Sequence, residues 1–289
     1  MKLIVETDIG RDADDFFALC YLISAGVEIV AVTVSPGDKD QITVAKGLLN
    51  ECGVHCPVGS AKPERDKSSV GGRHPDFLNQ YGYPLRTEPD GLGSDIIREA
   101  MSNHPDAELF VCGPLQSVGP YLNSGGKLGR STMQGGFCGY EQHQYDVVRL
   151  EKFEGKKFES TFNLGGDKNG AFAFLSGDVE SRAFVGKHLC HTIVYDAKIH
   201  EMVKTVKPAN RAMEVFHEHM DLYLSHQPVK MFHDPTAAVC HLHPECATWI
   251  RGKLIYEKGK WATEPDENGD LIAVDIDREK LWNYIAQGK

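Results

Sequence analysis

The stretch KLIVETDIGRDADDFFALCYLIS, residues 2–24, decides the fold class of this chain. It opens with a short apolar run, residues 2–5, and an acidic segment follows at once. From residue 14 to residue 26 apolar side chains recur at helical spacing, at Phe16, Phe17, Leu19, Cys20, Leu22 and Ile23. The stretch therefore predicts a buried strand, an acidic loop and an amphipathic helix.

The same unit recurs downstream. Residues 27–35, VEIVAVTVS, form a nearly continuous apolar run, and residues 41–53 form a helical pattern closed by Gly53. Further helix and strand patterns alternate up to residue 136. Near-continuous apolar strands that alternate with helices are typical of a parallel sheet buried on both faces. We expect an open, mostly parallel, Rossmann-like α/β sheet with helices on both faces.

The remaining segments complete this α/β prediction. Residues 62–93 are rich in Gly, Pro and charge and predict a long loop, and residues 139–160 predict no regular element. Residues 247–264 and 271–277 predict antiparallel strands before a closing helix. Because no internal repeat or linker interrupts the chain, we expect a single domain, 1–289, with a small antiparallel C-terminal addition.

Composition narrows the class of protein. The net charge of -10 would repel phosphate backbones, so we expect no nucleic-acid partner. The first apolar run is too short for a signal peptide or a membrane span, so we expect no membrane partner. Eight cysteines are scattered along a chain large enough to fold without disulfides, which favours reduced thiols and a cytoplasmic location.

Asp8, Asp12, Asp14 and Asp15 form a dense acidic cluster between the first strand and the first helix. Open α/β sheets bind ligands at this edge. A single Asp here would usually cap the helix, but four in eight positions exceed what capping needs. Crowded carboxylates repel one another unless a cation gathers them, and oxygen ligands favour calcium or magnesium. The cluster therefore predicts a site for a hard divalent cation.

A second acidic contributor appears far along the chain, where His233, Asp234 and Pro235 precede an apolar helix. Taken alone, this motif is usually a helix cap beside a structural histidine.

Five segments taken in order resemble the inosine-uridine nucleoside hydrolase family. They are ETDIGRDADDFFAL (6–19), VCGPLQSVG (111–119), MQGG (133–136), TFNLGGD (161–167) and MFHDPTAAV (231–239). The resemblance spans nearly the whole chain, and its most specific features are the acidic opening and the late His-Asp-Pro helix. It implies calcium-dependent hydrolysis of the N-glycosidic bond of a ribonucleoside, a role in purine or pyrimidine salvage, and a homodimer or homotetramer.

The resemblance also implies a role for each matching residue. Asp8 would bind the metal and act as general base, and His233 would protonate the departing base. The other expected metal ligands are Asp15, Asp234 and the backbone carbonyl of Cys112. Asp14 and Asn163 would hold the ribose hydroxyls.

The chain departs from the family pattern at several positions. The paired aspartates follow Asp8 at six and seven positions instead of four and five, so Asp12 lies in an inserted segment and could replace a ligand. Asp38 stands where the family has Asn, and Thr161 stands where it has an acid, for which Glu159 could compensate. We therefore add Asp12, Asp38 and Glu159 to the expected substrate-binding residues.

Two alternatives remain open from the residues. An Asp after the first strand is also the nucleophile of haloacid dehalogenase-type phosphatases, although Gly10 stands where their second Asp belongs. A nucleoside- or ribose-binding protein without turnover is the other alternative. The base pocket is expected from residues 62–93 and the segment after Phe216, with stacking candidates His74, Tyr81, Tyr83, Phe216 and Tyr223.

Overall fold

The computed structural model describes residues 1–139 and 147–289. Its central feature in these ranges is a ten-stranded sheet with the order β11-β10-β12-β7-β6-β5-β1-β2-β3-β4. The strands from β12 to β4 run parallel, and β10 is antiparallel to both β12 and β11. The predicted parallel α/β sheet and its antiparallel C-terminal addition are confirmed.

The strands of this sheet are β1 (Lys2–Thr7), β2 (Glu28–Val34), β3 (Val58–Ser60), β4 (Gly91–Leu92), β5 (Glu108–Val111), β6 (Leu128–Gln134), β7 (Val179–Val185), β10 (Ala247–Glu257), β11 (Lys260–Pro265) and β12 (Asp270–Ile276). A separate antiparallel pair consists of β8 (Val194–Asp196) and β9 (Val229–Met231).

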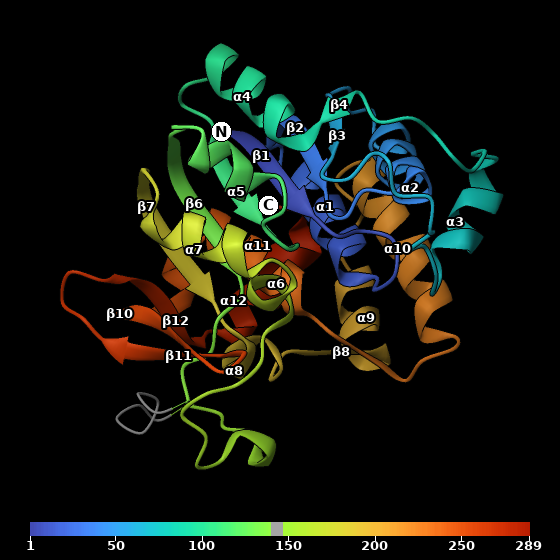
Figure 1. Ribbon diagram of the computed structural model, residues 1–289. Helices are drawn as coiled ribbons and strands as arrows, with labels where there is room; N and C mark the ends of the chain where they lie inside the picture. Colours follow the sequence, from blue (N-terminus) through green and yellow to red (C-terminus); the bar gives the residue numbers. More distant parts are fainter. Residues whose placement is uncertain (140–146) are drawn as a thin grey trace.

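The helices are α1 (Asp14–Ser24), α2 (Lys39–Glu51), α3 (His74–Tyr81), α4 (Gly93–Asn103), α5 (Val118–Asn123), α6 (Phe162–Gly166), α7 (Lys168–Ser176), α8 (Lys187–Cys190), α9 (Ala197–Lys204), α10 (Arg211–Leu224), α11 (His233–Leu242) and α12 (Arg278–Gln287). Two short 3-10 helices lie at Glu151–Phe153 and Pro244–Cys246. In Figure 1 the β10–β11 hairpin lies at one end of the molecule and α3 at the other.

Two apolar clusters cover the two faces of the sheet. In β1, Leu3 and Val5 belong to one cluster and Ile4 to the other, because successive side chains of a strand point to opposite faces. The first cluster includes residues of α1, α2, α10, α11 and α12, and the second includes residues of α4, α5 and α7. Helices therefore bury both faces, as the apolar strand sequences predict.

The expectation of a structureless loop over 62–93 was wrong. This segment contains α3, which begins with Pro75 in its first turn and buries Phe77 and Leu78, and it ends in β4. Only two large apolar side chains hold this short helix, so its flanking Gly and charged residues hid its period. The pattern also missed β7, whose Glu180 and Ser181 are exposed.

The expectation of no regular element over 139–160 is only partly answered. Glu151–Phe153 is a 3-10 helix, and residues 140–146 lie outside the described residues.

Candidate active site

The first strand and the first helix place the N-terminal acids at the carboxyl edge of the sheet. Asp8 follows the last residue of β1, and Asp14 and Asp15 form the first turn of α1. The N-cap position of α1 is Ala13, and no side chain caps the helix there. Asp15 instead accepts hydrogen bonds from the Thr7 hydroxyl at 2.5 Å and the Asp8 amide at 3.1 Å. Helix capping therefore does not explain these acids.

Asp234 joins them from the far end of the chain. It lies in the first turn of α11, which packs directly against α1. Carboxylate oxygens of Asp14, Asp15 and Asp234 all lie within 4.8 Å of one another, and each side chain is almost fully buried. Three carboxylates this close, and so poorly exposed to water, repel one another strongly.

Burial and this repulsion raise the pKa values of Asp8, Asp15 and Asp234. Burial and the charge of Asp14 raise the pKa of Asp15 to about 7. Burial together with Asp15 raises the pKa of Asp8 well above its ordinary value, and burial together with Asp14 does the same for Asp234. A bound cation would relieve this repulsion, and the donor set of carboxylate oxygens fits a hard divalent ion.

Asp14 behaves differently from the other acids. Burial would raise its pKa, but Lys230 and His233 outweigh burial and lower it. The Nζ atom of Lys230 lies 3.2 Å from Oδ1 of Asp14, and Nδ1 of His233 lies 3.0 Å from Oδ2. Asp14 is therefore an ionised carboxylate that is held on both sides.

A cavity of about 600 Å³ opens above this cluster. It is large enough for a nucleoside-sized molecule. Most of the residues predicted from the sequence line it: Asp8, Asp12, Asp14, Asp15, Cys112, Asn163, His233 and Asp234.

Cys112 and Asn163 come to the cavity from the middle of the chain. Cys112 directly follows β5, where its amide donates to the Glu6 carbonyl at 2.8 Å. Asn163 lies in α6, and its side-chain amide donates to both the backbone and the side-chain oxygen of Gln134, at 3.0 and 2.9 Å. Asn163 is therefore held rigidly at the wall of the cavity.

His233 has one nitrogen bound and one nitrogen without a partner. Its ring packs against His191 with centroids 4.5 Å apart, and Nδ1 contacts Asp14. Within the described residues, Nε2 has no hydrogen-bond partner. An imidazole held at Nδ1 and unpartnered at Nε2 is suited to exchange a proton with a ligand.

Asp38 and Glu159 lie elsewhere. Asp38 caps α2 by accepting from the amides of Asp40 and Gln41, and it also accepts from the Ser69 amide. Glu159 pairs with Lys156 at 2.7 Å, and its backbone pairs with that of Trp261. Neither residue lines the cavity, so neither enters the function proposed below.

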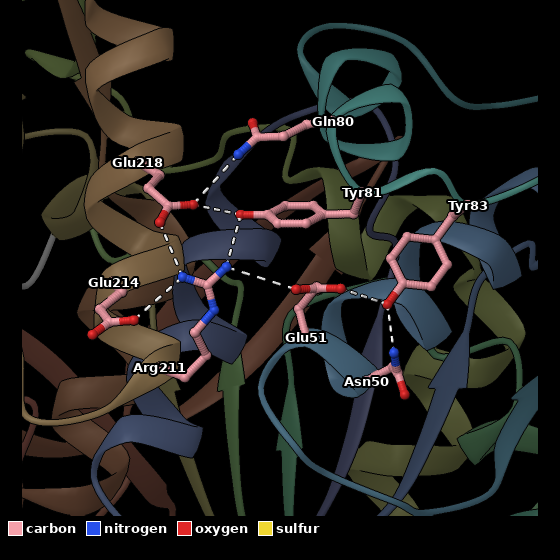
Figure 2. A network of polar contacts seen from close by, with 8 residues as sticks. All are labelled: Asn50, Glu51, Gln80, Tyr81, Tyr83, Arg211, Glu214 and Glu218. Carbon is pink, nitrogen blue, oxygen red and sulfur yellow. Dashed lines mark hydrogen bonds and ion pairs between the residues drawn. The ribbon is translucent and has the colours of Figure 1, made fainter.

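The stacking candidates also separate. Tyr223 lines the main cavity, whereas Phe216 is fully buried in the core. His74 lines a small neighbouring pocket of about 20 Å³, between α1, α3 and α10. Tyr81 and Tyr83 belong to a polar network that links α2, α3 and α10 (Figure 2).

Sequence reasoning missed Gln134, Arg11 and Arg73 in the cavity wall, and it missed Lys230, which contacts Asp12 and Asp14 behind that wall. Lys230 stands three positions before His233 in the short strand β9, within an apolar sequence where a lysine is unexpected. That position was the available signal, because a lysine is rarely buried unless it is paired.

The fold and this site together define a class of protein, namely α/β enzymes that bind a ligand over an acidic centre at the carboxyl edge of the sheet. The model of the inosine-uridine preferring nucleoside hydrolases matches residues 3–283, and the chain belongs to this family. It is therefore a hydrolase that acts on the N-glycosidic bonds of nucleosides. Family membership sets aside the phosphatase alternative.

Solved structures share the fold over nearly their full length. A plant nucleoside hydrolase matches with a TM-score of 0.70 at 19% identity, covering 99% of this chain and 98% of that one. An inosine-uridine preferring nucleoside hydrolase from Bacillus anthracis matches with a TM-score of 0.72 at 14% identity and the same coverage. An inosine-guanosine nucleoside hydrolase matches with a TM-score of 0.71 at 16% identity, again with 99% and 98% coverage. No curated protein sequence matches the chain.

The structure also describes the state of the cysteines and the length and polarity of the helices. All eight cysteines lie in the described part of the chain, and none of them forms a disulfide there. Across residues 1–139 and 147–289, every helix is too short or too polar to span a bilayer.

Proposed function

We propose that this protein hydrolyses a ribonucleoside to free base and ribose with the help of a calcium ion. The observation that carries the proposal is the convergence of Asp15 and Asp234, from opposite ends of the chain, beside Asp8 beneath a cavity of nucleoside size. We assign the ion to the carboxylates of Asp8, Asp15 and Asp234 and to the backbone carbonyl of Cys112. Carboxylate and carbonyl oxygens are the ligands that calcium prefers.

When bound, such an ion would polarise a water molecule and neutralise the acids around it. Asp8 is assigned as the general base that accepts the proton of the attacking water. Burial and the neighbouring carboxylates raise the pKa of Asp8, and a cation held beside it would favour the ionised form that can act as base.

Asp14 and Asn163 are assigned to the ribose hydroxyls. Asp14 is kept ionised and can accept hydrogen bonds from hydroxyls, and Asn163 is oriented by Gln134. A site built to bond hydroxyls discriminates strongly against sugars that lack them, because its buried polar groups are then left unpaired.

His233 is assigned to the departing base. Glycosidic cleavage passes through an oxocarbenium-like transition state in which negative charge builds on the leaving group. Nε2 of His233 is the nitrogen available to donate a proton to that group, and Asp14 holds the ring by Nδ1. The carboxylates beneath the sugar suit its developing positive charge.

The substrate class we propose is a small-molecule ribonucleoside, within purine or pyrimidine salvage. We further propose a homo-oligomeric, cytoplasmic enzyme. Tyr223 is the aromatic candidate for stacking on the base, because it lines the cavity.

The test is release of the free base from a panel of inosine, guanosine, adenosine, uridine and cytidine, each paired with its 2′-deoxy analogue. Protein stripped with EDTA is expected to lose activity and to regain it with CaCl2. Activity that is unchanged by EDTA would overturn the metal assignment. Equal turnover of a nucleoside and its deoxy analogue would overturn the ribose assignment.

A further inference from the structure

Lys230 is a buried lysine in direct contact with the acidic cluster. It lies in the middle of β9 opposite Tyr195 of β8, and only 3% of its surface is exposed. Its Nζ atom lies 2.5 Å from Oδ1 of Asp12 and 3.2 Å from Oδ1 of Asp14. A buried ammonium group is tolerated only where such partners compensate the lost hydration.

The contacts of Lys230 divide the five acids of the site into two groups. Asp12 and Asp14 each have a cationic partner. In the described part of the chain, Asp8, Asp15 and Asp234 make no ion pair, and Asp15 is held by the neutral Thr7 hydroxyl and the Asp8 amide. The negative charges of Asp12 and Asp14 are thus balanced by a side chain of the protein. Those of Asp8, Asp15 and Asp234 would be balanced by a bound cation.

Two contacts also fix the orientation of the Asp14 carboxylate. Lys230 contacts its Oδ1 and His233 contacts its Oδ2, so the carboxylate cannot turn without breaking one contact. Without Lys230, Asp14 would keep only the contact with His233, and its carboxylate oxygen lies within 4.8 Å of those of Asp15 and Asp234.

Asp12 belongs to the same arrangement. It lies in the segment that spaces Asp14 and Asp15 away from Asp8, and its side chain is more than half exposed. The second carboxylate that contacts Lys230 thus comes from the loop between β1 and α1.

We propose that Lys230 is a positioning residue that reserves Asp14 for the ribose and keeps it out of the metal site. This inference rests on the function proposed above and deepens it, because it names the residue that separates sugar binding from ion binding. Lys230 acts through Asp14 and does not itself contact the reacting atoms.

The test compares Lys230→Met with Lys230→Arg and with Lys204→Met. Lys204 is the control, because it also pairs with two carboxylates, but these, Glu201 and Asp221, do not line the cavity as Asp12 and Asp14 do. Calorimetry on EDTA-stripped protein measures calcium affinity without any substrate. Kinetics with a ribonucleoside and with its 2′-deoxy and 3′-deoxy analogues measure how well each hydroxyl is recognised.

For Lys230→Met we expect calcium affinity to be equal or greater, because a positive charge beside the ion site has been removed. We expect kcat/KM for the ribonucleoside to fall at least about 30-fold, mainly through KM. The preference for the ribonucleoside over at least one deoxy analogue should shrink about tenfold, as expected for a lost polar contact. Lys230→Arg should restore part of this preference, and Lys204→Met should behave as wild type.

Calcium affinity that falls more than tenfold in Lys230→Met would overturn the inference, since Lys230 would then support the ion site. An unchanged preference among the three sugars would overturn it as well. If Lys230→Met does not fold, the preference for the ribonucleoside over its deoxy analogues is measured on Lys230→Arg and on Asp12→Asn instead. A wild-type preference in both of these variants would overturn the inference. Wild-type protein that binds no calcium or releases no ribose would overturn the proposed function itself.

Discussion

The Nδ1 atom of His233 lies 3.0 Å from Oδ2 of Asp14, so a residue near the C-terminus is oriented by one near the N-terminus. The two side chains belong to α11 and α1, which pack against each other at the carboxyl edge of the sheet. A contact of this kind couples the orientation of a proton donor to that of a sugar-binding carboxylate. Its consequences can be measured separately for the base and for the ribose.

Replacing His233 by Ala should slow only the reactions in which the leaving group needs a proton. We expect kcat for a ribonucleoside to fall about 100-fold, within the usual range for general acid catalysis. The fall in kcat for 4-nitrophenyl riboside should be below about threefold, because nitrophenolate leaves without protonation. Steady-state kinetics on both substrates check this, with the exposed His226→Ala as control. Equal losses on the two substrates would exclude the assigned role.

Asp234→Asn should remove calcium binding without weakening the ion-free fold. In EDTA the variant should be at least as stable as wild type, since one of the mutually repelling carboxylates is gone. With calcium at 100 times its Kd, only wild type should gain about 2.7 kcal/mol of stability. Thermal melting with and without calcium measures both effects, and the surface variant Asp221→Asn should respond like wild type. A full calcium response in Asp234→Asn would contradict the ligand assignment.

The contribution of Asp15 to the stability of the protein in EDTA should fall as pH rises from about 4 to about 7. Burial and the charge of Asp14 raise the pKa of Asp15 from 3.8 to about 7, so the folded state binds this proton more tightly than the unfolded state. Stability from such a group is complete below the unfolded pKa and is lost as pH passes through the folded pKa. Burial raises the pKa of Glu6 to about 7 as well, which adds to the same trend.

Urea unfolding of wild type and of Glu6→Gln, in EDTA at pH 5 and pH 7.5, isolates the effect of one such acid. The stability of wild type relative to Glu6→Gln should fall between the two pH values, and the opposite contribution of the buried histidines, whose pKa values are lowered, cancels in this difference. Saturating calcium should stabilise wild type more at pH 7.5 than at pH 5, because an ion binds the ionised carboxylates and competes with protons. A stability difference between wild type and Glu6→Gln that grows with pH would contradict the raised pKa of Glu6.

Arg211 should hold α3 against α10 and α2. Its guanidinium contacts Glu218 at 3.0 Å, Glu214 at 3.3 Å and the Tyr81 hydroxyl at 3.2 Å, in the network of Figure 2. Arg211→Met should lower the free energy of unfolding by about 1 kcal/mol, because these groups are partly exposed and their pairing is screened.

Hydrogen exchange locates the effect of that substitution. Amides of α3 should exchange faster in Arg211→Met, while those of β1 and β5 stay as in wild type. Arg98→Met is the control, since its exposed ion pair with Asp95 at 3.9 Å and its hydrogen bond to Ser124 at 3.0 Å both lie outside α3. Uniformly faster exchange across the sheet would contradict a local role for Arg211.

The sequence predicted the parts of this site in which several residues of one kind lie close together in the chain. Four aspartates in eight positions after an apolar strand exceed what capping explains, and they do lie at the cavity. Asp38 was a weaker inference, because one acid at a helix start is as well explained by capping, which is its role here.

Lys230 shows why the rest could not be predicted. One lysine in a three-residue strand carries no periodic signal, and its partners lie more than 200 positions earlier in the chain. Its burial beside Asp12 and Asp14 follows from the packing of β9 near the start of α1, which no local pattern encodes.

By itself, the sequence determined the alternation of apolar strands and helices and the acidic segment at the end of the first strand, because both follow from short-range patterns of hydrophobicity and charge. Only the tertiary structure decided which of these acids pair with the cationic side chain of Lys230 and which do not. That division depends on distances of a few ångströms between side chains from opposite ends of the chain, and electrostatic energy in a buried site depends on those distances.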